Sequence, residues 1–415
     1  MAIIGAGVSG LVVAHLLHRA HEVTVFEAER EIGGHVHTVR VDTADETHHV
    51  DTGFIVYNEP NYPGFTRLLR RLRVATQEST MSFSVHQDRG GFEYSSAVPI
   101  GLLARPTLAA RPSFQRMIAD YLRWRRAAQR VLSSGELSDT TTIADFVVAD
   151  RYSPAFVERM LVPLGASIWS ANRSRFLGFP ARYVLEFFNN HGLLSRRERP
   201  QWRTVTGGAA SYVDSLVRPF RGRIRMASPV MSVRRDDDGV EIRTTRREPE
   251  RFDRVVIAAH SDQALRMLAD PTPRERALLG AFPYQVNDAV LHTDSRMLPR
   301  RRRAWASWNY HLPDDSDREV GVTYHMNRLQ RLRADREFCV SLNRGTDVDE
   351  ASVLQRIEYA HPLFTQATVR AQAEHESLNG ANHTYYCGAY WGHGFHEDGL
   401  QSGLRVAARF GMELR

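Results

Sequence analysis

The 415-residue sequence contains no lysine, only two cysteines and no run of 18 apolar residues. All 54 basic side chains are therefore arginines, which excludes every mechanism that needs a lysine Schiff base. Cys339 and Cys387 cannot build a disulfide framework, so we interpret them as small buried residues of a protein in a reducing cytoplasm. Without a long apolar run we expect no membrane-spanning helix, and any membrane contact would be peripheral.

The remaining composition is that of an ordinary globular protein, with 42% hydrophobic and 25% charged residues. The length allows a large core and favours two domains. A formal charge of +6 favours an anionic partner such as a membrane surface, but the sequence shows no nucleic-acid-binding module, so we predict no nucleic acid partner. The densest basic run, 300–303, is interpreted as a solvated loop, because short charge runs usually are.

The first ten residues carry a nucleotide-binding pattern. Residues 1–4 are a short apolar run typical of a buried parallel strand, and residues 5–10 read G-x-G-x-x-G before a helical apolar spacing. Such glycines permit a tight turn, close approach to a pyrophosphate and close helix–strand packing. A second strand ends in Glu27, 22 residues after Gly5, where an acid accepts hydrogen bonds from an adenosine ribose. The predicted contacts to a dinucleotide are Gly5, Gly7, Val8, Ser9, Gly10 and Glu27.

A glycine pair follows this unit. Gly33 and Gly34 let the backbone pass close to a ligand, most simply the same pyrophosphate, and His35 comes next. His35, His37 and the histidines at 48–49 are metal-ligand types. Strand alternation would put His35 and His37 on one face, but no third ligand is apparent there, so we predict no metal. Residues 50–56 indicate another strand beside the nucleotide unit.

From about residue 65 to 194 the pattern is helical. One apolar face contains Phe114, Met117, Ile118, Tyr121 and Leu122, and a bulky patch follows at 184–188. Such stripes most often form core, but a helical insert rich in Phe, Leu, Met and Trp also suits the wall of an apolar substrate cavity.

The second half of the chain is rich in strand patterns. Residues 228–233 and 240–244 predict a hairpin sheet, and 252–259 a buried strand. A further β-rich block covers 286–292, 321–326 and 338–343. The aromatic stretch 304–310, which contains Asn309, is consistent with sheet packing and equally with a substrate-cavity wall.

The end of the chain repeats the order strand, glycine-rich loop, helix. The strand reaches Gly388, the loop runs to Gly399, and Leu400, Leu404 and Ala407 follow at helical spacing. A helix N-terminus stabilises negative charge on a bound cofactor. Two such units at opposite ends of one chain suit FAD, whose adenine and flavin halves need separate anchoring.

These motifs together resemble the FAD-dependent amine oxidase and phytoene desaturase superfamily. The resemblance is carried by the opening glycines with Glu27, Gly33–Gly34, the strand reaching Val230, residues 252–259 and residues 388–399. The closer resemblance is to a bacterial branch found beside fatty-acid methyltransferases and cyclopropane fatty acid synthases, which includes desaturases of furan-fatty-acid synthesis. Stretches 34–38, 50–58, 79–85, 304–310 and 387–403 carry it.

The resemblance implies site residues by position. It adds Gly33, Gly34, His35, Val230, Gly388, Glu397, Asp398 and Gly399 to the FAD contacts. It places Tyr390, Trp391 and His393 at the flavin face, with Asn309, Tyr324 and His325 opposite. Two departures matter: amine oxidases commonly have Gly-Gly-Arg where this chain has His35, and they often place a lysine near the flavin, which this chain lacks.

We therefore expect an α/β fold with two parts. A discontinuous Rossmann-like FAD-binding domain would span 1–85, 200–262 and 380–415. A substrate domain, 86–199 and 263–379, would combine a mixed sheet (strands within 284–343) with a helical cap at 105–199. We expect FAD to be held non-covalently.

The expected activity is dehydrogenation of an unsaturated or methyl-branched fatty acyl chain by hydride transfer to flavin, with the substrate carried in a phospholipid. One alternative is an oxidase of amines or amino acids; another is a flavin-bound, non-catalytic partner of a fatty-acid methyltransferase. The expected location is the cytoplasm, with peripheral contact at the inner membrane face.

Overall fold

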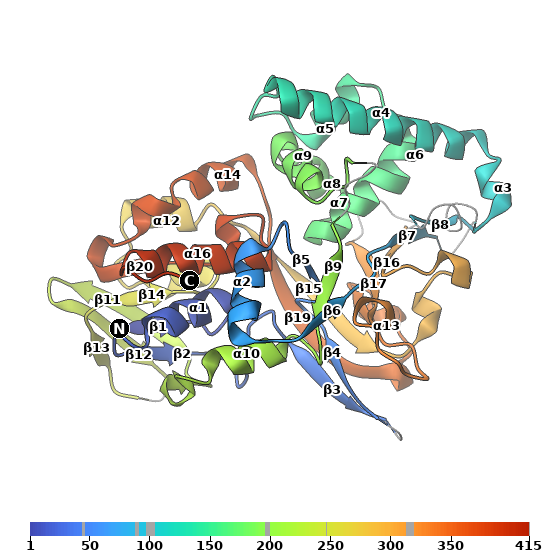
Figure 1. Cartoon of the computed structure of the whole chain (residues 1–415). Helices are drawn as coiled ribbons and strands as arrows, with labels where there is room; N and C mark the ends of the chain where they lie inside the picture. The colour runs from blue at the N-terminus through green and yellow to red at the C-terminus, as the bar shows by residue number, and fades with distance from the viewer. Residues whose placement is uncertain are drawn as a thin grey trace.

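A five-stranded parallel sheet forms the centre of the half of the molecule that holds both termini (Figure 1). The computed structural model describes residues 1–43, 46–87, 91–96, 104–195, 200–245, 247–312 and 319–414. All four pairings of the sheet are parallel, and its three-residue strands are almost wholly buried, as expected for a sheet covered on both faces. In spatial order the strands are β10 (Ile224–Arg225), β2 (Thr24–Phe26), β1 (Ala2–Ile4), β14 (Val255–Ile257) and β20 (Thr384–Tyr386).

Two cores cover the faces of this sheet. On one face lie α1 (Val8–Leu17), α2 (Pro63–Leu72), α10 (Ala210–Val217) and α16 (His396–Ala408). On the other lie α11 (Ser261–Met267), α12 (Pro273–Leu279), α14 (Gln366–Ala373) and α15 (His375–Leu378), with the antiparallel sheet of β11 (Val230–Asp236), β12 (Gly239–Thr244) and β13 (Glu250–Phe252).

A seven-stranded mixed sheet organises the other half. Its pairings are antiparallel except the parallel one between β16 and β7. In spatial order the strands are β19 (Val353–Pro362), β15 (Tyr284–His292), β18 (Cys339–Leu342), β17 (Gly321–His325), β16 (Trp308–His311), β7 (Phe83–His86) and β8 (Glu93–Ser95).

Two small antiparallel sheets lie between the halves. One pairs β3 (Thr38–Asp42) with β4 (Thr47–Asp51), and the other orders β5 (Tyr57–Asn58), β9 (Trp202–Val205) and β6 (Thr76–Glu78). The short helix α13 (Met326–Leu329) follows β17 directly.

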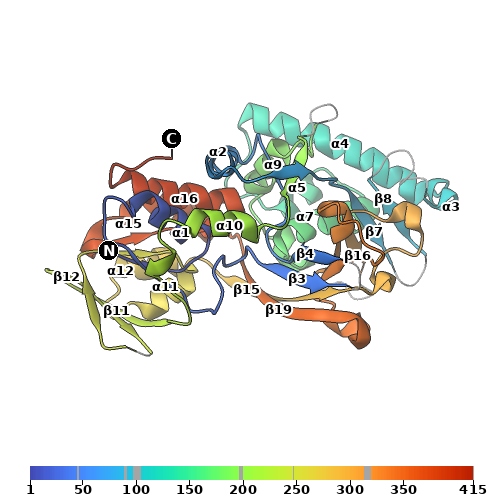
Figure 2. The same cartoon turned by 60° about the horizontal axis from the view of Figure 1, so that its bottom comes forward.

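A group of helices forms a cap above the seven-stranded sheet (Figures 1 and 2). Its aromatic-rich core includes Trp124, Phe156, Trp169 and Phe188 and continues into the sheet through Val85 and Val322. The cap helices are α3 (Pro106–Ala109), α4 (Pro112–Ser134), α5 (Ile143–Ala149), α6 (Pro154–Phe156), α7 (Val162–Trp169), α8 (Arg173–Leu177) and α9 (Ala181–Asn190), with a π-helical turn at Val157–Leu161.

The structure confirms the predicted α/β class, the hairpin of β11 and β12, and the three strands of the second β block. Two expectations were wrong in part. The segment expected to be helical from residue 65 includes β6, β7 and β8, and the strand expected over 50–56 ends at Asp51. The domain boundaries stay a prediction; the proposed limit at residue 85 falls inside β7, which pairs with β16.

Two surface-related expectations can be located. Arg300 to Arg303 are exposed, and Arg301 forms an ion pair with Glu93. Within the described ranges, no helix is both long and apolar enough to cross a bilayer. The same residues hold no group of three His, Cys, Asp or Glu side chains placed for a metal ion.

Candidate functional site

One large cavity runs between the two halves. Its volume is about 2340 Å³. Ligand cavities for a single small molecule are commonly about 300–1,000 Å³, so this one has room for a dinucleotide and a second molecule. Its walls come from the loop between β1 and α1, residues 33–37, 228–231, 258–260 and 388–396, the seven-stranded sheet, and the cap.

The glycines of the first loop shape one end of the cavity. Gly5 has φ +104°, a left-handed conformation that favours glycine, and its N–H donates to the Phe26 carbonyl (2.8 Å). A side chain at Gly7 would meet nothing within 4 Å, so the space beside this residue is open to a ligand. Gly7 is the N-cap of α1 and has no side chain to accept the first N–H groups of the helix, which are therefore free for an anion. Gly10 does not line the cavity; a Cβ there would lie 2.1 Å from the Gly5 carbonyl oxygen, so it serves helix–strand packing.

The second glycine pair joins this end. The Gly33 N–H donates to the Ala6 carbonyl (2.8 Å), and a Cβ on Gly34 would stand 3.3 Å from the Gly7 Cα. Glu27 is held in place because its carboxylate accepts the N–H groups of Ala6 (2.7 Å) and Glu29 (3.0 Å). The cavity lining here is Gly5, Gly7, Val8, Ser9, Glu27, Gly33, Gly34, His35 and Val230.

His35 cannot replace the arginine charge of the Gly-Gly-Arg pattern. Its ring stacks on Tyr359 (5.0 Å) and lies near His260 (6.0 Å) and His361 (5.5 Å). Burial, followed by the two neighbouring histidines, lowers its pKa to about 3, so the imidazole is neutral at pH 7. The N-terminus of α1 still supplies positive potential for a pyrophosphate at this end.

The C-terminal loop forms the middle of the cavity. Gly388, Tyr390 and His393 line it, as predicted for this segment. The cap holds the loop in place: the Tyr183 hydroxyl donates to the Gly392 carbonyl (3.0 Å), and the Tyr183 ring stacks on His393 (4.3 Å). The hydroxyl of Tyr390 and Nε2 of His393 are both enclosed by protein, without a hydrogen-bond partner in the described chain. These two side chains therefore shape the wall more readily than they exchange protons with a ligand.

Sequence reasoning missed His396 at the start of α16. Its ring lines the cavity, stacks on Phe54 (3.9 Å) and meets the Tyr212 hydroxyl at Nε2 (2.7 Å). Burial lowers its pKa to about 3, so it is neutral. Its position in the glycine-rich segment was the one available signal.

The expected roles of Asn309 and His325 need correction. Both belong to the seven-stranded sheet, where successive side chains point to opposite faces. Their neighbours Trp308 and Tyr324 line the cavity, whereas Asn309 and His325 do not. The Asn309 amide bonds to Ser84, Ala306 and Thr323, and His325 bonds to Glu337 (2.7 Å). Trp308 belongs to the stretch 304–310 that the sequence offered as a possible cavity wall, but the strand pattern did not say which of its side chains face the cavity.

Four residues of the C-terminal segment also do not line the cavity. Trp391 packs behind the loop on His375 (4.3 Å), and Gly399 packs on α1, where a Cβ would lie 2.9 Å from Val8 Cγ1. Asp398 accepts the Phe395 N–H (2.9 Å) and caps α16. The Glu397 carboxylate accepts the N–H groups of Gly64 and Phe65 (both 2.8 Å) at the start of α2. The two carboxylates thus hold backbone N–H groups, not the cavity ligand, and Trp391 and Gly399 serve packing.

The cap supplies the other end of the cavity. Helix α4 presents Ile118, Tyr121, Leu122 and Arg125 to it, the i, i+3, i+4, i+7 spacing of one helix face. The lining from the cap contains no Asp or Glu within 104–195. The rest of this wall is Met160, Leu164, Ser167, Ile168, Trp169, Ser170, Phe187, His191, Gly192 and Leu193. It is an apolar chamber with one cation and one histidine.

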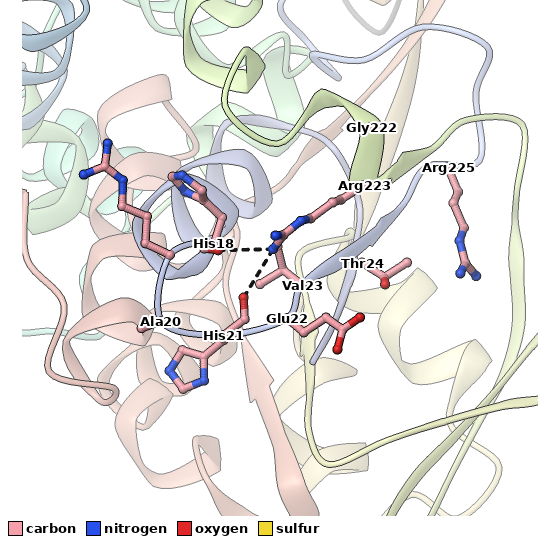
Figure 3. Close-up of a pocket in the computed structure, with 10 residues that line it drawn as sticks. His18, Ala20, His21, Glu22, Val23, Thr24, Gly222, Arg223 and Arg225 are labelled. Carbon is pink, nitrogen blue, oxygen red and sulfur yellow. Dashed lines mark hydrogen bonds between the residues drawn. The ribbon is translucent and has the colours of Figure 1, made fainter.

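A second, smaller hollow of about 520 Å³ lies on the surface beside the end of α1. Figure 3 shows Arg223 reaching the carbonyl oxygens of His18 (3.1 Å) and His21 (3.4 Å). Arg225 is ion-paired with Glu250. Two of the three arginines that line this hollow, Arg223 and Arg225, are held by protein partners, and the glycine loops predicted to bind a nucleotide lie in the other cavity, so we place the functional site in the large cavity.

Comparison with known proteins identifies the family. The profile of the family described as flavin containing amine oxidoreductase matches residues 8–341. The chain belongs to this family. It is an FAD-dependent oxidoreductase, as its α/β fold and glycine loops predicted.

Solved structures share the whole fold at low identity. A putrescine oxidase bound to putrescine superposes with a TM-score of 0.71 at 15% identity, over 99% of this chain and 98% of that one. A fatty acid isomerase from P. acnes that produces CLA gives 0.71 at 16%, over 99% and 98%. Cyclohexylamine oxidase from Brevibacterium oxydans IH-35A gives 0.66 at 16%, over 98% and 97%. At these identities the likeness shows the fold alone.

The residues present fit FAD. Gly7 leaves open the space where a pyrophosphate has to approach, Glu27 stands at the end of β2, and α1 presents free N–H groups. The loop 388–396 lies further along the same cavity and ends at the N-terminus of α16. Cys387 does not line the cavity, and burial raises the pKa of its thiol to about 12. Non-covalent binding stays our expectation.

Proposed function

We propose that this oxidoreductase dehydrogenates an unsaturated or methyl-branched fatty acyl chain. The observation that carries the proposal is the apolar wall of the cap, which offers a long flexible chain Ile118, Leu122, Met160, Leu164 and Phe187. Burying such a chain yields about 0.8 kcal/mol per CH₂ group, so a C18 chain gains much of its affinity from this wall alone.

An amine substrate is less well matched. An alkylammonium inside a protein needs a carboxylate or an aromatic cage to offset its desolvation. The described lining of the cap holds no carboxylate, and its one charged side chain, Arg125, is itself cationic, so only aromatic rings such as Trp169 and Phe187 are left there to hold an amine. The amine oxidase alternative is therefore tested below as the competing outcome.

Dehydrogenation forms a carbon–carbon double bond and removes one hydride and one proton. When bound, FAD supplies the acceptor for the hydride. A base or a water molecule has to take the proton. Among the side chains that line the cavity near the cap we propose His191, at the end of α9, as the acceptor, with Tyr324, on β17, as a hydrogen-bond donor.

His191 is set up to accept a proton. Its Nδ1 lies 2.9 Å from the Phe187 carbonyl oxygen, which can only accept, so Nδ1 carries the hydrogen and Nε2 keeps its lone pair. Burial lowers its pKa to about 4, so it is neutral at pH 7. Burial raises the pKa of Tyr324, which therefore stays protonated and acts as a hydrogen-bond donor.

The test uses purified, FAD-loaded protein with unsaturated and methyl-branched C18 acyl substrates, as free acids and as phospholipids, in air. We expect a product lighter by two hydrogens by mass spectrometry and bleaching of the flavin absorbance when oxygen is excluded. Gly7→Val, which should lose FAD, is the control without cofactor. Bleaching by putrescine or cyclohexylamine but by no acyl chain would establish the amine oxidase alternative instead. Unchanged acyl masses with a stably loaded flavin would favour the non-catalytic partner.

A further inference from the structure

Arg125 is a buried cation at the cap end of the cavity. Arg125 is 8% exposed and is part of the cavity wall. Its Nη2 and Nε both donate to the Leu194 carbonyl oxygen (2.7 and 3.0 Å), and its guanidinium lies 5.5 Å from the Tyr121 ring centre. A guanidinium has five N–H donors, so three remain, two on Nη1 and one on Nη2.

This arginine has no carboxylate partner among the residues that the structure describes. Burying a charge costs several kcal/mol unless it is paired, and buried charges in proteins are therefore normally paired. A carbonyl and an aromatic face leave the positive charge itself unbalanced.

A second deeply buried arginine among the described residues shows the usual solution. Arg235, 7% exposed, donates to both oxygens of Glu275 (2.7 and 2.9 Å) and to Asp270 (2.9 Å). Arg235 is not part of the wall of the large cavity, and its anions come from the protein. Arg125 lines a cavity, where an anion can come from a ligand.

We propose that the substrate is a free carboxylic acid whose carboxylate pairs with Arg125. This inference rests on the proposed acyl-chain dehydrogenation and names its substrate class. The donors left on Nη1 and Nη2 lie side by side, the arrangement that binds a carboxylate through two parallel hydrogen bonds. The acyl chain would then lie along Ile118, Leu122 and Leu164.

The chemistry of the anchor separates three substrate classes. A methyl ester is neutral and gives the guanidinium no anion. An amine adds a second positive charge beside it. In a phospholipid the anion is the headgroup phosphate, beyond the glycerol, whereas in a free acid it is the end of the acyl chain itself. Because Arg125 stands on the same wall as the apolar side chains, we propose a free fatty acid in place of the expected phospholipid-bound chain.

The test measures binding by isothermal titration of FAD-loaded protein with linoleate, methyl linoleate and a C18 alkylamine. A charged hydrogen-bonded pair contributes about 1.5–3 kcal/mol, so we expect linoleate to bind 10- to 150-fold more tightly than its methyl ester. Arg125→Met should remove this preference while leaving ester affinity within about twofold. Arg125→Lys should retain part of it, because the charge stays and the fork is lost. Arg126→Met, an exposed position on the same helix, should change neither affinity.

The ratio of the affinities of the unaltered protein for linoleate and for its methyl ester tests the anchor even if Arg125→Met does not fold. Equal affinity for acid and ester would overturn the proposal, as would an equal loss in Arg126→Met. The two proposals fail separately. If linoleate and other C18 acids bind tightly through Arg125 but lose no hydrogens, the carboxylate anchor stands and dehydrogenation is refuted. If ester and acid are both dehydrogenated with the same KM, dehydrogenation stands and the anchor is refuted.

Discussion

The side chain of Gln330 holds Asp51 at two points. Its Oε1 accepts the Asp51 N–H (2.9 Å), and its Nε2 donates to the Asp51 carboxylate (2.8 Å). The carboxylate also accepts the Ala209 N–H (2.9 Å) and the Thr38 hydroxyl. Because Asp51 ends β4 and Gln330 follows α13, this pair ties the nucleotide half to the seven-stranded sheet, across 279 residues of sequence.

This buried carboxylate predicts a pH-dependent stability. Burial raises the Asp51 pKa from 3.8 to about 7. Folding therefore favours the protonated form, so its contribution to stability is complete below about pH 4 and is lost as the pH rises through 7. In the unaltered protein the unfolding free energy should therefore fall between about pH 4 and 7. Asp51→Asn should reduce the slope of this fall by up to about 1.4 kcal/mol per pH unit, the value for one proton. Urea unfolding at pH 4.5–8 measures it. Asp237→Asn, at an exposed turn, should leave the slope unchanged, and an unchanged slope in Asp51→Asn would refute the assignment.

Substitutions of the second and third glycines of the opening motif should have different effects. A Cβ on Gly7 meets nothing within 4 Å, so Gly7→Val should fold with a nearly unchanged Tm and lose at least tenfold in FAD affinity. A Cβ on Gly10 would stand 2.1 Å from the Gly5 carbonyl oxygen, so Gly10→Ala should lose about 1–3 kcal/mol of stability through overpacking. Thermal unfolding with and without FAD separates the two. A similar Tm loss in both variants would contradict the difference.

Replacing Glu397 should lower the stability of the protein more than it weakens FAD binding. Its carboxylate accepts two N–H groups at the start of α2, so Glu397→Ala leaves two buried donors unpaired, each costing about 1–3 kcal/mol. Denaturant unfolding of the FAD-free protein should show this loss. Glu186→Ala, exposed on α9, is the matched control. Unchanged stability with weakened FAD binding would restore the cofactor-binding role that the sequence suggested.

Sequence reasoning worked where chemistry depends on the local backbone. The glycine positions and Glu27 could be placed because a tight turn, a helix start and a strand end each need particular residues at fixed offsets. Asn309 and His325 were misplaced because a strand pattern locates the strand without fixing which face meets the cavity. One register step separates them from Trp308 and Tyr324.

Other site residues depend on distant contacts. Arginine in a helix usually indicates a solvated face, yet Arg125 stands seven residues after Ile118 and so on the inner face of α4. The helical spacing contained this information, but the missing carboxylate could be seen only in three dimensions. The partnership of Asp51 with Gln330 left no local signal.

His191 should be the proton acceptor, rather than His393, which the sequence placed at the flavin face. His393 Nε2 is enclosed without a partner, whereas Nε2 of the half-buried His191 keeps a lone pair at the cavity. His191→Phe can retain the ring stacking on Phe187 (3.9 Å) and should lower kcat for acyl dehydrogenation about 100-fold, with FAD content unchanged. His393→Phe can likewise retain the stacking on Tyr183 and should lower kcat by less than threefold.

Because the pKa of His191 is about 4, kcat/KM should be independent of this group from pH 6 to 8 and fall tenfold per unit below pH 4. Added imidazole should partly restore His191→Ala if the ring acts as a base. A larger loss of kcat in His393→Phe than in His191→Phe would assign the proton acceptor to the loop at residues 388–399 and leave His191 as part of the cavity wall.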